Sequence, residues 1–182
     1  MLFRSKLQQE DRDAALVQMD SAVNMFTKPY LKTAAPYLLA RAQLLNETGK
    51  YRPAVNDYNE YESLMSTQLG AGFFYLRSQA ETNGHLYQQA LNDLKKAIEM
   101  EPQEALYYAE KASLEIRVGL KDDAEQTARQ LISMAPNDAD GYLFLGLAQC
   151  MKDQKTEGLQ NLQKAKELGH SQAQSLIDKY LK

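Results

Sequence analysis

A regular internal repeat constrains the fold of this chain more than any other feature. Pro102 and Pro136 each follow an alanine by twelve positions, Ala90 in the first case and Ala124 in the second. Further apolar residues fill the helical positions between each alanine and its proline, and proline cannot continue a helix. The spacing of the two prolines falls within the period of about 20–50 residues that is typical of repeat proteins. The sequence therefore predicts a stack of short helices repeated along the chain, in which neighbouring copies share their core.

The same apolar stripe occurs at three other places, over residues 15–23, 54–61 and 158–165. A glycine precedes three of the stripes by five or six residues, at Gly49, Gly84 and Gly119. Glycine adopts the positive φ at which a helix ends and the chain reverses, so each of these positions predicts a tight turn. The turn before the last stripe, over residues 152–155, lacks glycine.

Each turn is preceded by a second type of helix with its own pattern. A large residue is followed four positions later by a small one, which gives two closely packed helices a knob and a hole. The pairs are Leu38 and Ala42, Phe74 and Ser78, Tyr108 and Ala112, and Tyr142 and Gly146.

This pattern resembles the tetratricopeptide repeat (TPR), most clearly from Gly84 to Pro102 and at the Leu145-Gly146 pair. The resemblance implies an all-α fold, a right-handed superhelix of antiparallel helix pairs (a TPR-like α-solenoid). Three residues depart from the family pattern: Lys111 replaces its usual leucine, and Glu81 and Glu115 replace its usual tyrosine. We expect slight irregularities of superhelical pitch there.

Residues 1–182 are predicted to form a single array. Residues 1–34 hold an incomplete repeat, in which residues 15–23 form a second helix after a turn and a remnant of the first. Four repeats follow at 35–70, 71–104, 105–138 and 139–170, and residues 171–182 form a C-terminal capping helix. The cap has Ala173, Leu176, Ile177, Tyr180 and Leu181 on one side. The N-terminal edge, with Phe3, predicts either further repeats upstream or self-association through residues 1–30.

Composition and motifs argue against several classes of function. The 21 basic and 24 acidic residues give a formal charge of −3, which argues against a nucleic-acid binder. No apolar run is long enough for membrane insertion. The only cysteine, Cys150, is predicted to pack in a core. Cys150, His85 and His170 together supply too few ligands for a zinc site. We predict no enzyme activity, catalytic residue or cofactor. Cytoplasmic location is the default, and an upstream targeting segment is left open.

In the family that the chain resembles, the first helices of the repeats line a groove that binds peptides. The resemblance therefore implies a protein or peptide partner for an interaction scaffold, and the alternative is an accessory region of a larger enzyme or of a transport or envelope assembly. Tyr75 and Tyr107 stand beside residues that already fill the core position, so either is a candidate for the groove. The predicted groove residues are Gln43, Asn46, Tyr75, Gln79, Asn83, Ser113, Arg117, Leu143 and Leu147.

Overall fold

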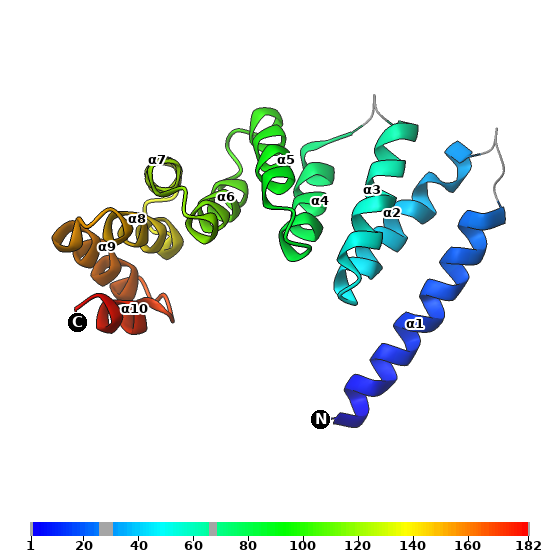
Figure 1. Ribbon diagram of the computed structural model, residues 1–182, viewed down its shortest axis with the longest axis horizontal. Coiled ribbons are helices and arrows are strands. Elements are labelled where there is room, and N and C mark those ends of the chain that lie inside the picture. Colours follow the sequence, from blue (N-terminus) through cyan, green and yellow to red (C-terminus); the bar gives the residue numbers. More distant parts are fainter. Residues whose placement is uncertain (1, 26–30, 66–68, 182) are drawn as a thin grey trace. The chain divides into compact units, whose positions relative to one another are not determined.

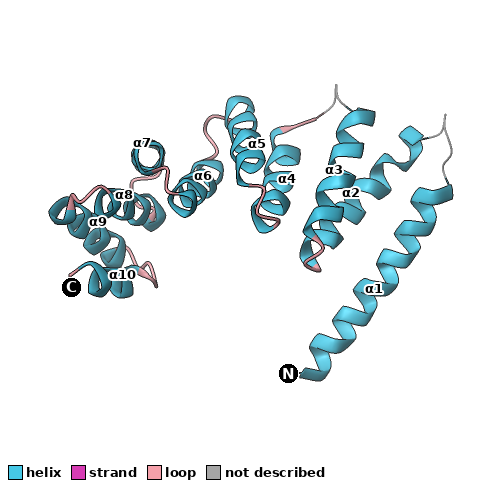
Figure 2. Ribbon diagram, viewed as in Figure 1, coloured by secondary structure: helices cyan, strands magenta, loops and turns pink. Residues whose placement is uncertain are grey.

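The computed structural model describes residues 2–25, 31–65 and 69–181, and only the backbone of residues 2–9, 31 and 32. Over these residues every regular element is an α-helix (Figure 2). The chain divides into two compact units, Met1–Asp93 (unit 1) and Leu94–Lys182 (unit 2), with the boundary inside helix α5 (Tyr87–Met100). Each unit is described by itself.

Unit 1 contains four complete helices (Figure 1): α1 (Leu2–Met25), α2 (Leu31–Glu47), α3 (Tyr51–Met65) and α4 (Ala71–Asn83). Each packs against the next one along the chain. Leu38 and Tyr58 are completely buried between them, and Tyr58 meets the edge of the Phe73 ring at 5.8 Å between centroids. Burial, and to a lesser extent the Glu47 carboxylate, raises the pKa of Tyr58 to about 12.

Helix α1 corrects the prediction for the N-terminal region. Leu2–Met25 is one continuous helix, so the predicted turn before residue 15 does not exist. Residues 8–13, before the predicted second helix, contain neither glycine nor proline, and their glutamine, glutamate and arginine favour helix. The N-terminal end of α1 projects past the ends of α2 and α3 (Figure 1). The side chain of Phe3 lies outside the described residues.

Unit 2 contains the end of α5 and five further helices: α6 (Ala105–Val118), α7 (Lys121–Met134), α8 (Ala139–Met151), α9 (Lys155–Glu167) and α10 (Ala173–Tyr180). Neighbouring helices from α6 to α10 pack against one another in chain order. Helices α8 and α9 approach each other closely at Gly146 and Gly158. A Cβ on Gly146 would lie 2.7 Å from the Gly158 carbonyl oxygen, which confirms the small position predicted there.

The turns between paired helices use two different devices. Gly49 and Gly119 have φ of +80° and +83°, as predicted. The turn at Gly84 differs, because Gly84 itself has φ −79° and the next residue, His85, adopts φ +62°. In the turn without glycine, Asp153 adopts φ +63°. Histidine and aspartate are among the residues that enter the left-handed region most readily.

Polar pairs, one of them buried and two half-buried, join the two helices of a repeat. Their members lie 16 residues apart: Arg41 with Asp57, Arg77 with Asp93, and Lys111 with Thr127. The Lys111 ammonium also donates to Glu115, its neighbour one turn along α6. Glu81 lies one turn after Arg77 on α4, with 3.9 Å between its Oε1 and the Arg77 Nε. The family departures at Lys111, Glu81 and Glu115 therefore belong to polar clusters inside the repeats.

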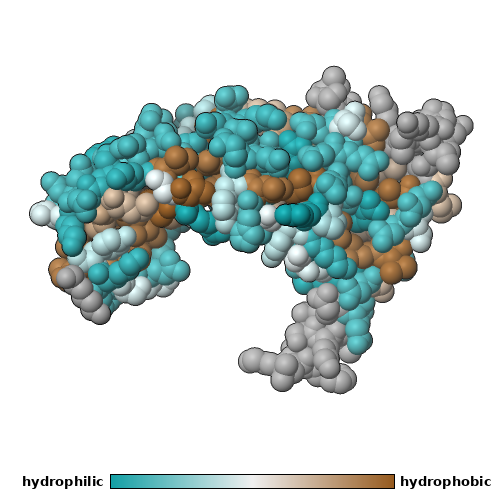
Figure 3. Space-filling view, viewed as in Figure 1, coloured by the Kyte–Doolittle hydropathy of each residue, from teal (hydrophilic) through white to brown (hydrophobic). Residues whose placement is uncertain are grey.

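Helix α10 packs against the core of unit 2 through its apolar residues. Ala173 and Ile177 are buried in one cluster with Leu143, Cys150 and Leu162, and Leu176 and Tyr180 pack against it. Leu181 is the exception, because it is 66% exposed and follows the end of the helix. The visible surface of both units is mostly hydrophilic, with hydrophobic residues in narrow bands (Figure 3).

Candidate binding surface

Two hydrogen bonds organise the predicted groove residues of unit 1. Asn83 on α4 donates from Nδ2 to Oδ1 of Asn46 on α2 at 3.3 Å. One turn earlier on α4, Gln79 donates from Nε2 to the Tyr75 hydroxyl at 2.8 Å. These four side chains, and Gln43 on α2, are exposed or half-buried. Unit 1 therefore presents amide and phenol groups on the accessible side of α2 and α4.

In unit 2 the predicted residues separate into accessible and buried ones. Arg117 is exposed, and Ser113 and Leu147 are half-buried. The prediction is wrong for Leu143, which is only 3% exposed and lies in the core cluster with Ile177 of α10. The last repeat differs from the others in this respect, because the capping helix covers part of the surface that a groove would use.

Tyr107 is also excluded from the accessible surface. It is 6% exposed, and its hydroxyl donates to Glu101 Oε2 at 3.1 Å. Tyr108 beside it is buried too, and its hydroxyl donates to the Pro102 carbonyl oxygen at 3.1 Å. Both tyrosines therefore tie α6 to the turn before it, and Tyr75 is the one of the two candidates that stays accessible.

A pocket of about 210 Å³ lies between α6 and α8 in unit 2. Its walls combine apolar side chains with two carboxylates and one hydroxyl. The lining residues are Leu106, Ala109, Glu110 and Ser113 from α6, and Asp140 and Phe144 from α8. Leu106 is a large apolar residue, yet it is 46% exposed. Ser113, one of the predicted groove residues, therefore lines a pocket.

The electrostatics of this pocket centre on Glu110. Burial raises the pKa of the Glu110 carboxyl above its ordinary value, Arg117 partly opposes this, and the Asp140 charge adds to it. Asp140 lies 3.3 Å from Nε2 of His170, an ion pair only when the histidine is protonated. Within the described part of the chain, Glu110 has neither a hydrogen bond nor an ion pair of its own.

Sequence reasoning missed Glu110, Asp140 and Phe144, although the repeat carried a signal for them. Asp140 follows Leu106 by the same interval that separates Pro136 from Pro102, and Phe144 follows Glu110 by that interval as well. The pocket is therefore built from the same two positions in consecutive repeats.

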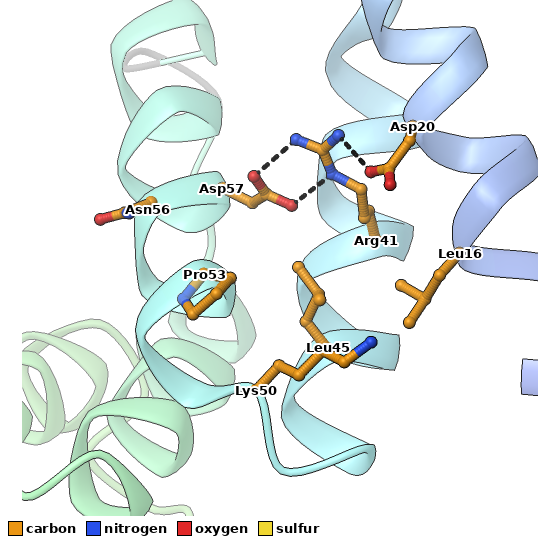
Figure 4. Close-up of a pocket in the computed structure, with 8 residues that line it drawn as sticks. All are labelled: Leu16, Asp20, Arg41, Leu45, Lys50, Pro53, Asn56 and Asp57. Carbon is orange, nitrogen blue, oxygen red and sulfur yellow. Dashed lines mark hydrogen bonds and ion pairs between the residues drawn. The ribbon is translucent and has the colours of Figure 1, made fainter. Parts of the chain in front are cut away.

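A second pocket, of about 400 Å³, lies in unit 1 among α1, α2 and α3 (Figure 4). The Arg41 guanidinium sits between two carboxylates in it: it donates to Asp57 on α3 at 2.7 and 2.8 Å and to Asp20 on α1 at 2.8 Å. The hydrogen bond to Asp57 is the largest cause of the raised pKa of Arg41. Arg41, Asp57 and Asp20 satisfy one another in this pocket, so we assign this cluster to holding α1 in place.

Solved structures of repeat proteins share this arrangement of helices. The crystal structure of MamA matches with a TM-score of 0.75 at 21% identity, over 93% of this chain and 95% of that one. YrrB, described as a TPR protein with an unusual peptide-binding site, matches with a TM-score of 0.77 at 17% identity, over 94% and 85%. The first TPR of Spaghetti (RPAP3), bound to the HSP90 peptide SRMEEVD, matches at 0.58 and 16% identity, over 61% and 90%.

No family model matches the sequence, and neither does any curated protein. The likeness in structure nevertheless decides the architecture, because it extends over nearly the whole of two repeat proteins. The chain has the tetratricopeptide-repeat fold. It is an all-α solenoid of the TPR kind, as the period of its prolines and alanines predicted.

Few side chains in the part of the chain that the structure describes are suited to metal binding or nucleophilic chemistry. No cluster of three or more metal-binding side chains occurs among the residues that the structure describes. Burial raises the pKa of the Cys150 thiol, which lowers its reactivity at neutral pH. His85 bonds Tyr87 through Nδ1, and the backbone amide of Gln172 donates to Nδ1 of His170. None of the described helices is long and apolar enough to cross a membrane.

Proposed function

We propose that this chain is a non-catalytic interaction scaffold that binds a peptide or protein segment along the first helices of its repeats. The observation that carries the proposal is the accessible side of α4, where Tyr75, Gln79 and Asn83 present hydrogen-bonding groups on a rigid helix. Such groups suit an extended segment, whose backbone offers one donor and one acceptor at most residues. Two proteins of the same fold support this choice, since YrrB is described by its peptide-binding site and the RPAP3 repeat holds a peptide.

Selection from a random peptide library on the purified chain tests the proposal. Peptides that bind the wild type should lose affinity for the double variant Gln79→Ala, Asn83→Ala, because each lost hydrogen bond costs about 0.5–1.5 kcal/mol. Both side chains are accessible, so the fold should persist, and thermal unfolding followed by circular dichroism checks this.

The matched control is Lys95→Ala with Glu99→Ala. These two residues are exposed on α5, a second helix of a repeat. The control should bind the selected peptides as the wild type does. Peptides that lose affinity for the control and keep it for the α4 variant would place binding on the other face and contradict the proposal.

A further inference from the structure

The pocket between α6 and α8 has the size of a side chain. Its volume of about 210 Å³ is below the roughly 300–1,000 Å³ typical of pockets that enclose a free small molecule. Ser113 lines the pocket and is a half-buried residue of the predicted groove, so a peptide bound along α6 would pass over the opening. This inference rests on the proposed function, because it concerns one side chain of a bound segment.

The walls of the pocket are apolar, and its polar groups are acceptors. Leu106, Ala109 and Phe144 form an apolar lining, whereas Glu110 and Asp140 bring two carboxylates. Neither Glu110 nor the Ser113 hydroxyl has a hydrogen bond elsewhere in the described part of the chain. A carboxylate is an acceptor only, so a guest must bring the donors.

The nearby cations do not neutralise the pocket. Arg117, seven residues after Glu110 on α6, only partly opposes the rise that burial causes in the pKa of the Glu110 carboxyl. His170 contacts Asp140 and leaves Glu110 without a partner. Two carboxylates therefore face a pocket in which no basic side chain lies.

We propose that this pocket binds a lysine or arginine side chain of the partner segment. The aliphatic stem of such a side chain would lie along Leu106 and Ala109, and its cationic head would donate to Glu110 and Asp140. Phe144 in the lining is an aromatic residue, and a guanidinium stacks on aromatic rings more readily than an ammonium, which favours arginine over lysine. An acidic segment such as the SRMEEVD peptide held by RPAP3 would bring its carboxylates against like charges here.

The test uses the peptides selected on the full chain and the double variant Glu110→Gln, Asp140→Asn. We expect lysine or arginine to be enriched at one peptide position, and we expect the double variant to bind these peptides at least about 10-fold more weakly. The matched control Glu157→Gln, Asp178→Asn changes the net charge equally at exposed sites on α9 and α10. The control should bind as the wild type does.

The outcomes separate this inference from the proposed function. Selected peptides without a preferred basic position, or with equal affinity for the wild type and the pocket variant, would overturn the inference and leave the scaffold proposal standing. A library that yields no binding peptide would overturn both. The single variant Asp140→Asn provides a second measurement if the double variant does not fold, and it should weaken binding of the basic peptides alone.

Discussion

At the scale of single residues, Arg77 is the most heavily engaged side chain that the structure describes. It is 4% exposed, and it donates to Asp93 at 2.6 and 3.0 Å, to Glu62 at 2.6 Å and to Asn59 at 3.0 Å. Its guanidinium also lies 5.1 Å from the centroid of the Phe73 ring. Burial by itself lowers the pKa of Arg77, but its carboxylate partners raise it above the ordinary value. One charge thus joins α3, α4 and α5.

Sequence analysis recognised the unusual charges but not their partners. Lys111, Glu81 and Glu115 stood out because the family pattern has apolar or aromatic residues at those positions. The pairing of Arg77 with Asp93 depends on the register between two helices, which propensities and periodicity do not fix. The charged residues are compatible with a core only because the register brings opposite charges together.

Arg77→Leu should destabilise the protein by about 3–5 kcal/mol, because it removes the ion pair between Arg77 and the buried carboxylate of Asp93. Adding Asp93→Asn should recover part of this loss, since it removes the buried negative charge that Arg77 paired in the wild type. The measurement is chemical denaturation of the wild type and both variants, with Arg129→Leu on the exposed side of α7 as the control. Equal stability of Arg77→Leu and the wild type would contradict the role given to this cluster.

At the scale of elements, the helices that belong to the repeat pattern could be predicted from the sequence, whereas the extent of α1 could not. The helices α2 to α9 follow an alternating pattern with turn residues between them, so period and punctuation locate them. Helix α1 has no internal glycine or proline to divide it, and its apolar residues are spread around the helix. Its packing comes from single contacts such as Leu16, which is 5% exposed, and the ion pair between Asp20 and Arg41.

Deleting residues 171–182 should lower the melting temperature, because it uncovers the core cluster around Leu143 and Leu162. The point variant Ile177→Ala should do so without shortening the chain, at a cost of about 2–5 kcal/mol. The exposed neighbour Ser175→Ala is the control on the same helix. Differential scanning calorimetry on the four proteins decides the matter, and unchanged melting of the truncated chain would remove the capping role of α10.

At the scale of the whole molecule, what remained hidden from sequence was which accessible positions form a pocket. The accessibility of Tyr75, Gln79 and Asn83 on α4 could be predicted, because the register of the repeat that the sequence resembles places them away from the core. Their role in a groove stays a prediction. The prediction of Leu143 as a groove residue was wrong because α10, a helix outside the repeat pattern, packs in the same cluster as Leu143. Conversely, Glu110 and Asp140 come together through the packing of α6 against α8, the first helices of two consecutive repeats.

The last prediction concerns the oligomeric state. Helix α1 leaves Val17 64% and Met25 81% exposed, and apolar side chains exposed on one helix favour contact with another chain. We therefore expect the average mass from light scattering to rise above the 20.6 kDa monomer as concentration increases. Val17→Asp with Met25→Asp should keep the chain monomeric, and Phe3→Asp should shift it in the same direction. Leu181→Asp, a similar change at a residue that is 66% exposed near the other end, should leave self-association unaltered. A mass of 20.6 kDa at every concentration would show that α1 does not mediate self-association.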